Sequence, residues 1–290
     1  MTAVVLGPSS VVGRHLLRRL AGSGTGGLCY SSRRPADPVP DVFTWLSLPA
    51  DDEIRVPDGS VLYCLAPLTA LPPILQRMTG VGRVIALGTS STAYKGESTD
   101  PAERELAWEF GQAEHAVSLH CRERGIAWTI LRPTMVYDPG RDRNVSAIAA
   151  VARRFGFVPL AWPARGLRQP IHADDVAQAM MAARDAPAAV DAAFVIPGSE
   201  TLEYREMVRR IIRATGRRAI VVYLPLGPAR LAMAVWLRAT GAAYSLAMLE
   251  RMNTDLVFDS EPAREALGVS FRPFRPEFAR PDDARKSQGS

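Results

Sequence analysis

Lysine is nearly absent from this 290-residue chain: only Lys95 and Lys286 occur among its 35 basic residues. The net charge of +5 therefore comes almost wholly from arginine, whose planar guanidinium binds phosphates and carboxylates through two hydrogen bonds. Two interpretations stay open, namely solvated surface charge and phosphate-containing ligands. The arginines form no stripe with interleaved aromatic residues, so we expect no nucleic-acid partner.

Cysteine is also scarce, and its pattern excludes several classes of protein. Cys29, Cys64 and Cys121 are odd in number, far apart and set in apolar surroundings. No metal-ligand spacing is present, so we expect reduced thiols in a cytoplasmic protein and no metal site. No apolar run approaches the roughly 20 residues of a membrane-spanning helix, so no transmembrane segment is expected. A serine-hydrolase function has little support, because GxSxG does not occur.

The first half of the chain alternates between short apolar runs and longer amphipathic segments. Alternating strands and helices predict a parallel, doubly wound α/β sheet. Gly125 is expected to end the longest helix. The expected strands are residues 2–7, 27–32, 41–48, 60–68, 83–91 and 126–133, and the expected helices are 11–22 and 105–125.

Beyond residue 138 the pattern is less regular. We expect a dinucleotide-binding Rossmann-type core over 1–140, then a mixed segment, 141–278, that completes the core and forms a small C-terminal substrate domain, and a disordered tail over 279–290. The apolar stretch 226–239 has two interpretations. It is either a helix facing the core or a surface that meets a membrane face, a second copy of the chain or another partner subunit.

The segment GPSSVVG, residues 7–13, follows the first expected strand and opens a helix; we call it the glycine loop. Gly7 permits a tight turn, and Gly13 permits close packing of the helix on the strand. A helix N-terminus offers N–H groups and partial positive charge to a pyrophosphate. Ser10 stands where a third glycine is usual, but serine is small and its hydroxyl can donate to a phosphate. An altered but working loop is expected.

The residues after the second strand bear on the choice of cofactor. An NAD site usually has an acidic residue there to hold the ribose 2′-hydroxyl, whereas here Arg33 and Arg34 follow two serines and the first acid is Asp37. Arginine at this place favours a 2′-phosphate. We therefore expect NADP, with NAD as the alternative. In the interpretation without a ligand, both arginines simply face solvent.

Five motifs in order resemble the extended and atypical short-chain dehydrogenase/reductase superfamily, in its nucleoside-diphosphate-sugar epimerase group. The resemblance extends over residues 3–276 and implies a Rossmann fold and an NAD(P)-dependent oxidoreductase or epimerase acting on a nucleotide-sugar or a similar small molecule. The glycine loop departs from the family's GxxGxxG only at Ser10. The motifs are the glycine loop, GTSSTAY at 88–94, ILRPTMVYDPG at 130–140, RQPIHADDVAQAM at 168–180 and LVFDSEPAREALGVSFRPFRP at 256–276.

The resemblance also implies roles for individual residues. Ser90 matches the catalytic serine, with Tyr94 close by. Cofactor contacts are expected from Gly7, Ser10, Gly13, Arg33, Ala66, Pro67, Ser90 and Pro133. Substrate contacts are expected from Tyr137, Asn144, Arg168 and, more weakly, Arg251.

The family's chemistry uses Tyr and Lys in a YxxxK arrangement, which places both on one helix face. This chain contains no YxxxK, because neither of its two lysines follows a tyrosine by four residues. Alignment on Ala113-Glu114 puts Trp108 and Gln112 at the two positions. Three functions stay open: an enzyme with relocated acid–base groups (Ser90, Tyr94 and Lys95, then Tyr137), a catalytically silent sensor, scaffold or accessory subunit that binds a dinucleotide, or a site for another ligand.

Four polar sites have a structural and a functional interpretation. His172 is a buried structural histidine or a base. Asp174 and Asp175 cap the helix that they begin or take part in the site. Residues 141–144 are a solvated loop or bind an anion at the next helix N-terminus. Tyr94 and Lys95 are adjacent and would point apart on a strand, so they replace YxxxK poorly.

Overall fold

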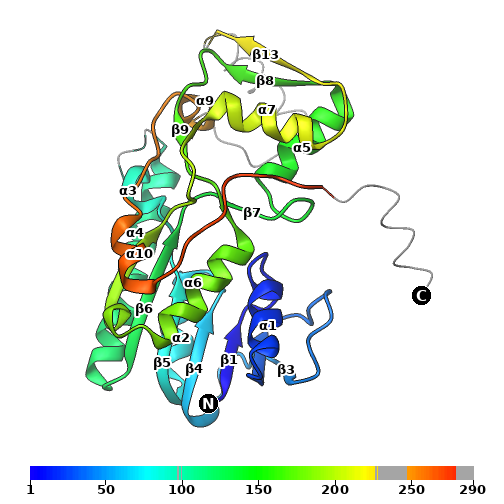
Figure 1. Cartoon of the computed structure of the whole chain (residues 1–290). Helices are drawn as coiled ribbons and strands as arrows, with labels where there is room; N and C mark the ends of the chain where they lie inside the picture. Colours follow the sequence, from blue (N-terminus) through cyan, green and yellow to red (C-terminus); the bar gives the residue numbers. More distant parts are fainter. Residues whose placement is uncertain (97, 99, 226, 228–246, 279–290) are drawn as a thin grey trace, which may run out of the picture. The chain divides into compact units, whose positions relative to one another are not determined.

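The computed structural model describes residues 1–96, 98, 100–225, 227 and 247–278, and it divides the chain into two compact units (Figure 1). Unit 1 comprises Met1–Thr134, Ala173–Pro197 and Asp259–Phe271. Unit 2 comprises Met135–His172, Gly198–Phe258 and the chain from Arg272 onward. Two segments beyond the expected boundary at residue 140 thus return to unit 1, which is built from three pieces of chain.

Unit 1 holds a seven-stranded, wholly parallel sheet in the order β11-β6-β5-β4-β1-β2-β3. This order confirms the doubly wound Rossmann-type fold, because the chain leaves β1 toward one edge and returns to its other side with β4. The strands are β1 (Ala3–Leu6), β2 (Gly27–Ser31), β3 (Phe43–Ser47), β4 (Ile54–Cys64), β5 (Met78–Leu87), β6 (Ala127–Pro133) and β11 (Ala192–Ile196).

Helices cover both faces of this sheet, which explains why every residue of β1 is buried. Helix α1 packs with α6 on one face, and α2 and α4 share a core cluster with Val4, Leu62 and Val84 on the other. The helical elements of unit 1 are α1 (Gly13–Gly22), η1 (Leu68–Ala70), α2 (Leu71–Gln76), α3 (Thr92–Lys95), α4 (Pro101–Glu123), α6 (Ala173–Asp185), η2 (Pro187–Ala189) and α10 (Glu261–Leu267).

The ends of α4 follow from its sequence. The Asp100 carboxylate accepts the Ala102 N–H at 3.0 Å, and Pro101 occupies the first turn, where no N–H is needed. Gly125 follows with φ +65, as expected for the residue that ends this helix. Buried Ala107, Ala113 and Val117 mark the face that packs on the sheet.

Unit 2 is a smaller α/β assembly around a second core cluster. Its parallel strand pair β8–β13 packs with α5 and α7, and four short strands form two further pairs, β7–β10 and β9–β12. Tyr137, Met207 and Ile211 lie fully buried in this core. The elements are β7 (Val136–Tyr137), α5 (Val145–Phe155), β8 (Phe157–Ala161), β9 (Leu167–Arg168), β10 (Ile171–His172), β12 (Leu202–Glu203), α7 (Tyr204–Ala214), β13 (Ile220–Leu224) and α9 (Ala247–Arg251).

The structure differs from one expectation, and two others concern residues that it does not describe. The backbone of Tyr94 and Lys95 forms the short helix α3, so the argument that the two would point apart on a strand does not apply. The apolar stretch 226–239 and the tail 279–290 lie outside the described residues, apart from Gly227. Within the described part of the chain, no helix is long and apolar enough to cross a membrane.

Candidate functional site

The glycine loop lies at the carboxyl end of β1, and its geometry requires both glycines. Gly7 has φ +82, and a Cβ there would lie 2.7 Å from the backbone nitrogen of Ala66, which follows β4. A Cβ on Gly13 would lie 2.1 Å from the Pro8 carbonyl oxygen. No larger residue fits either position without moving backbone. The glycines therefore hold β1, the loop and the β4 end in close contact.

Ser10 fits the loop without the backbone freedom of glycine. The described non-glycine residues with positive φ are Ala164 and Asp191, so Ser10 has an ordinary backbone conformation. Its hydroxyl oxygen accepts the Gly13 N–H at 3.0 Å, and this bond closes the loop onto the first turn of α1. The hydroxyl hydrogen remains available to donate. Among the described residues, the N–H groups of Val11 and Val12 have no backbone acceptor, so they also suit an anion.

The carboxyl ends of β1 and β4 meet at the point where the strand order reverses. Leu65 donates its N–H to the Leu6 carbonyl at 2.8 Å, which holds the two strand ends together. Ala66 and Pro67 follow directly, half-buried and exposed respectively. In open α/β sheets, ligands bind in the crevice at this reversal point. Unit 1 thus brings together the glycine loop and the Ala66-Pro67 turn.

The end of β2 presents two exposed arginines beside a fixed turn. The Ser31 hydroxyl donates to the Arg33 carbonyl at 2.7 Å and accepts from the Trp45 indole N–H at 3.0 Å. The Arg34 guanidinium lies 5.9 Å from the centre of the Trp45 ring. For Arg33 the structure records neither an ion pair nor a side-chain hydrogen bond among the described residues, so its guanidinium is available to a ligand.

Ser90 is buried beyond the end of β5, where its hydroxyl is already engaged. It donates to the Pro133 carbonyl at 3.0 Å, and the Ser90 N–H points to the same oxygen at 3.3 Å. Sequence reasoning placed both residues among the cofactor contacts, and the structure places them in contact with each other. In this arrangement the Ser90 oxygen can accept a hydrogen bond from a ligand but cannot donate one to it.

Helix α4 carries an ion pair that sequence reasoning missed. Arg132, at the end of β6, donates two hydrogen bonds of 3.0 Å from Nε to the Glu114 carboxylate and a further one from Nη2. The carboxylate raises the pKa of Arg132. A Cβ on Gly88, just after β5, would lie 2.7 Å from Glu114, so this glycine makes room for the pair. Glu114 therefore faces the carboxyl ends of β5 and β6.

The direction of the Glu114 side chain shows which face of α4 lies at the carboxyl ends of β5 and β6. Residues four and eight before it share its face, and these are Phe110 and Leu106. Trp108 and Gln112 are exposed and belong to another face, and Trp108 is 66% exposed. None of the four carries a group that titrates near neutral pH. The lack of a tyrosine and lysine on α4 therefore does not depend on how the helix is aligned with the family.

In unit 2, Tyr137 is fully buried and stacks edge-on against two rings. Its ring centroid lies 5.1 Å from that of His172 and 4.9 Å from that of Phe274. The short strands β7 and β10 pair in register, so Tyr137 lies opposite His172. This packing favours the structural interpretation of His172. A substrate contact of Tyr137 stays a prediction.

Arg168 is 5% exposed, and its guanidinium donates to backbone carbonyls. It binds the carbonyls of Leu167 at 2.7 Å, Thr254 at 2.8 Å and Arg251, and lies 5.3 Å from the centre of the Tyr204 ring. The structure thus brings Arg168 and Arg251 together, with Arg168 anchoring the chain after α9. The guanidinium is buried and bound to protein, and its contact with a substrate phosphate stays a prediction.

Residues 141–144 form a cap of the helix that follows, which contradicts the anion-binding interpretation. The buried Asp142 carboxylate accepts the Asn144 N–H at 2.7 Å, the Ser146 N–H at 3.2 Å and the Ser146 hydroxyl at 2.7 Å. These bonds occupy donors at the start of α5 that an anion would need. Asn144 itself is exposed at the N-cap position, and its side chain makes no capping bond.

Asp174, in the first turn of α6, is paired with an arginine of α1. Its carboxylate accepts bonds from Arg19 Nε at 2.6 Å and Nη2 at 2.8 Å, and His15 Nδ1 lies 3.6 Å away. This pair joins α6 to α1 on one face of the sheet. The sequence contained no sign of it, because the two residues are 155 positions apart.

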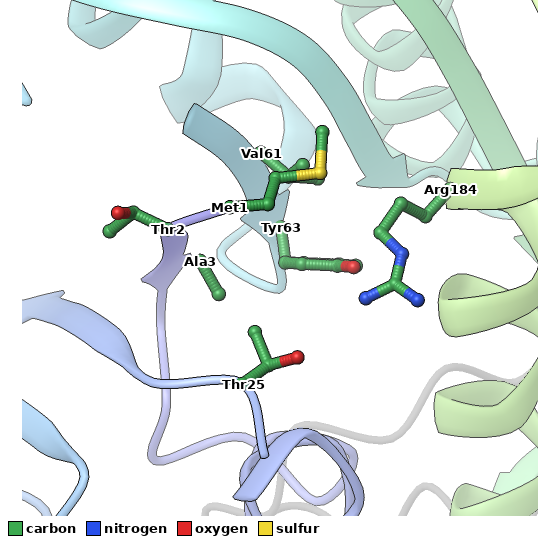
Figure 2. Close-up of a pocket in the computed structure, with 7 residues that line it drawn as sticks. All are labelled: Met1, Thr2, Ala3, Thr25, Val61, Tyr63 and Arg184. Atoms are coloured by element: carbon green, nitrogen blue, oxygen red, sulfur yellow. The ribbon is translucent and has the colours of Figure 1, made fainter. Parts of the chain in front are cut away.

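A small hollow lies at the opposite ends of the strands and is not the dinucleotide crevice. Met1, Thr2 and Ala3 line it at the amino end of β1, together with Val61, which pairs with Ala3, and with Thr25, Tyr63 and Arg184. Figure 2 shows the Tyr63 hydroxyl turned toward the Arg184 guanidinium. Burial raises the pKa of Tyr63 to about 12, so the phenol stays neutral.

The described residues contain no group of three or more His, Cys, Asp or Glu that could hold a metal ion. The three cysteines are free and buried, and burial raises the pKa of each thiol to about 12. A thiol with such a pKa is inert near neutral pH.

Comparison with known proteins identifies similar sequences and structures. Residues 73–196 match the model of the NAD dependent epimerase/dehydratase family. Among curated proteins, an uncharacterized protein of Sinorhizobium fredii, y4nG, is 28% identical over 207 residues. The match covers 67% of this chain and half of that protein's length.

Two solved structures illustrate the shared fold. An epimerase from Methanothermobacter thermautotrophicus superposes with a TM-score of 0.71 at 16% identity, covering 95% of this chain and 89% of that one. UDP-glucuronic acid 4-epimerase from Bacillus cereus, in complex with UDP-glucuronic acid and NAD, gives a TM-score of 0.65 at 14% identity over 93% and 94%. The family match begins after the glycine loop, so the loop is separate evidence. The family match confirms the resemblance inferred from the sequence to NAD-dependent epimerases and dehydratases over residues 73–196, and the solved structures show that the fold is shared.

Proposed function

We propose that this chain binds a nicotinamide dinucleotide in unit 1 and acts as an oxidoreductase or epimerase on a nucleotide-sugar or a similar small molecule. The observation that carries the proposal is the glycine loop at the sheet's reversal point. Its two glycines are required by backbone contacts of 2.1 and 2.7 Å, and the next helix turns its N-terminus toward the loop. The epimerase neighbours, one of which holds NAD and a UDP-sugar, support the same function.

The residues present fit such a cofactor. The glycine loop, with Gly7, Ser10 and Gly13, would hold the pyrophosphate through N–H groups and the Ser10 hydroxyl. The turn at Ala66-Pro67 would lie beside it. Ser90 and Pro133, joined by their own hydrogen bond, would line the nicotinamide end. When bound, the cofactor would supply hydride transfer.

We further propose that NADP is preferred over NAD. Arg33 is exposed at the end of β2, and no acidic residue precedes Asp37 in this turn. The bond from the Ser31 hydroxyl to the Arg33 carbonyl fixes the backbone from which the guanidinium extends. A doubly charged 2′-phosphate would gain a charge-assisted contact there that a hydroxyl lacks.

The proton transfer must differ from the usual one. The face of α4 that carries Glu114 offers Phe110 and Leu106, neither of which exchanges a proton. The Ser90 hydroxyl can accept a hydrogen bond, but its hydrogen is already engaged in a hydrogen bond to the Pro133 carbonyl. Tyr94 and Lys95 on α3 are the remaining candidates for acid and base in unit 1, and Tyr137 follows in unit 2. We propose that turnover, where it occurs, uses this relocated set.

Turnover assays test the reaction directly. The full chain is incubated with NADPH or NADP and a panel of UDP-sugars and carbonyl compounds, while epimer formation and the nicotinamide absorbance are followed. Turnover that Tyr94→Phe or Lys95→Met abolishes without loss of cofactor affinity would support the relocated set. Unchanged turnover in both variants would refute it.

The second candidate is a catalytically silent sensor, scaffold or accessory subunit that binds the dinucleotide. One specific observation favours it: α4 contains neither a tyrosine nor a lysine, so the usual dyad is absent from this helix whichever way it is aligned. Cofactor binding without turnover of any compound in the panel would support this candidate. A structure of the chain soaked with NADPH would then show which polar group, if any, lies near the nicotinamide C4.

A further inference from the structure

The outward face of the strand pair β8–β13 in unit 2 is apolar and exposed. Phe157 lies opposite Ile220 in the parallel register, and Pro159 lies opposite Val222. Phe157 is 43% exposed and Ile220 is 67% exposed. The alternate residues Val158 and Leu160 face inward, where they pack with α5 and α7. A half-buried strand pair normally has polar residues on its outer face, so an outer face made of apolar residues is unusual.

An exposed aromatic residue extends this face at one end. Phe155, which ends α5, is 51% exposed, and its ring centroid lies 6.3 Å from that of Phe157. We call the five residues Phe155, Phe157, Pro159, Ile220 and Val222 the apolar strip; Figure 1 shows the two strands that carry most of it side by side.

Arginines without carboxylate partners flank one end of the apolar strip. Arg153 and Arg154 precede Phe155, and Arg217 and Arg218 precede Ile220; all four are exposed. Within the described residues, none of these four arginines forms an ion pair. By contrast, the arginines earlier on α7 share Glu206.

The sequence explains why the strand pair and the segments that carry these arginines contain no acidic residue. No Asp or Glu occurs between residues 143 and 173, or between 207 and 249. The fold brings these two acid-free stretches together as β8 and β13. Chance mixing of the chain's 30 acidic residues would place several in such stretches, so the partner of this face is expected to be negatively charged.

We propose that the apolar strip and its flanking arginines dock unit 2 on an anionic lipid bilayer. Aromatic and aliphatic side chains would enter the boundary between headgroups and acyl chains, while the guanidinium groups bind lipid phosphates. Ile220, Val222 and Pro159 favour lipid over nucleic acid, because aliphatic side chains offer bases no stacking surface. The binding is peripheral and does not rest on the proposed cofactor function.

Vesicle sedimentation of the full chain tests this proposal. Vesicles of phosphatidylcholine alone are compared with vesicles that also contain anionic phosphatidylglycerol. We expect binding to the anionic vesicles that is at least about tenfold tighter and that weakens as salt is added. The Arg217→Gln and Arg218→Gln changes should each weaken it roughly fivefold.

A matched pair of double variants separates the apolar strip from net charge. Phe157→Glu with Ile220→Glu should weaken vesicle binding at least about tenfold, whereas Val42→Glu with Val190→Glu, exposed apolar residues of unit 1, should change it less than about twofold. If the first pair does not fold, Phe157→Ser alone replaces it. Equal loss in both pairs, or no binding to anionic vesicles, overturns the proposal. Binding to an oligonucleotide that Phe157→Glu with Ile220→Glu also abolishes would overturn it as well. Self-association of the chain that accounts for the sedimentation would do the same.

Discussion

Replacing Gly13 by alanine gives the most quantitative test of the glycine loop. The new Cβ would lie 2.1 Å from the Pro8 oxygen and 2.6 Å from the Pro8 carbonyl carbon. That oxygen separation is about 1 Å shorter than Cβ atoms tolerate, and both neighbours are backbone. The loop must therefore open, which breaks the bond between the Ser10 hydroxyl and the Gly13 N–H.

The expected cost follows from this clash. Overpacking of this kind costs about 1–3 kcal/mol of unfolding free energy, or a fall in melting temperature of roughly 2–4 °C per kcal/mol for a protein of this size. Affinity for NADPH and NADH should fall together by at least about tenfold, because the loop meets the pyrophosphate that both share. Thermal unfolding and nicotinamide fluorescence measure the two effects.

Gly22 provides the matched control on the same helix. A Cβ there meets nothing within 4 Å, so Gly22→Ala should leave cofactor affinity unchanged and raise stability slightly, by about 0.5–1 kcal/mol at most. The reasoning fails if Gly13→Ala keeps full affinity for both cofactors. It also fails if the two variants lose stability equally.

Three further predictions address other parts of the account. Arg33→Asp should weaken NADPH at least about tenfold more than NADH in a binding titration, because only the former has a 2′-phosphate to be repelled; equal loss would refute the NADP preference. Ser90→Ala should lower any turnover and cost about 1 kcal/mol of stability through the lost bond to the Pro133 carbonyl, and an unchanged rate would exclude a catalytic role. The Arg210 guanidinium holds the pKa of Glu200 below its ordinary 4.5, so this pair stabilises the fold above that pH and the contribution is lost as the pH falls. Glu200→Gln should therefore cost about 1–2 kcal/mol at pH 7 in denaturant unfolding, with a difference from the native chain that shrinks below about pH 4; a constant difference would contradict the pairing.

The parts of the fold that could be predicted are those with local causes. Gly7 and Gly13 could be read from the sequence because a strand, a turn and a helix N-terminus adjoin there. The parallel sheet followed from the alternation of strands and helices, and Gly125 ended the longest helix as expected.

The parts that could not be predicted depend on contacts between distant residues. The sequence did not indicate that the Arg168 guanidinium binds carbonyls more than 80 positions later in the chain. Glu114 served only to align α4, although its pairing with Arg132 decides which face of α4 meets the sheet edge. The strand pair β8–β13 escaped detection because its outer face is as apolar as its inner face, which removes the alternation that marks a half-buried strand.

The central claim is that unit 1 binds a nicotinamide dinucleotide at the glycine loop. Titration of NADPH and NADH into the full chain, followed by nicotinamide fluorescence, tests it most directly. We predict saturable binding of both, with NADPH bound more tightly and both weakened together by Gly13→Ala. Failure of either cofactor to bind at any concentration would contradict the account, and so would binding that Gly13→Ala leaves unchanged.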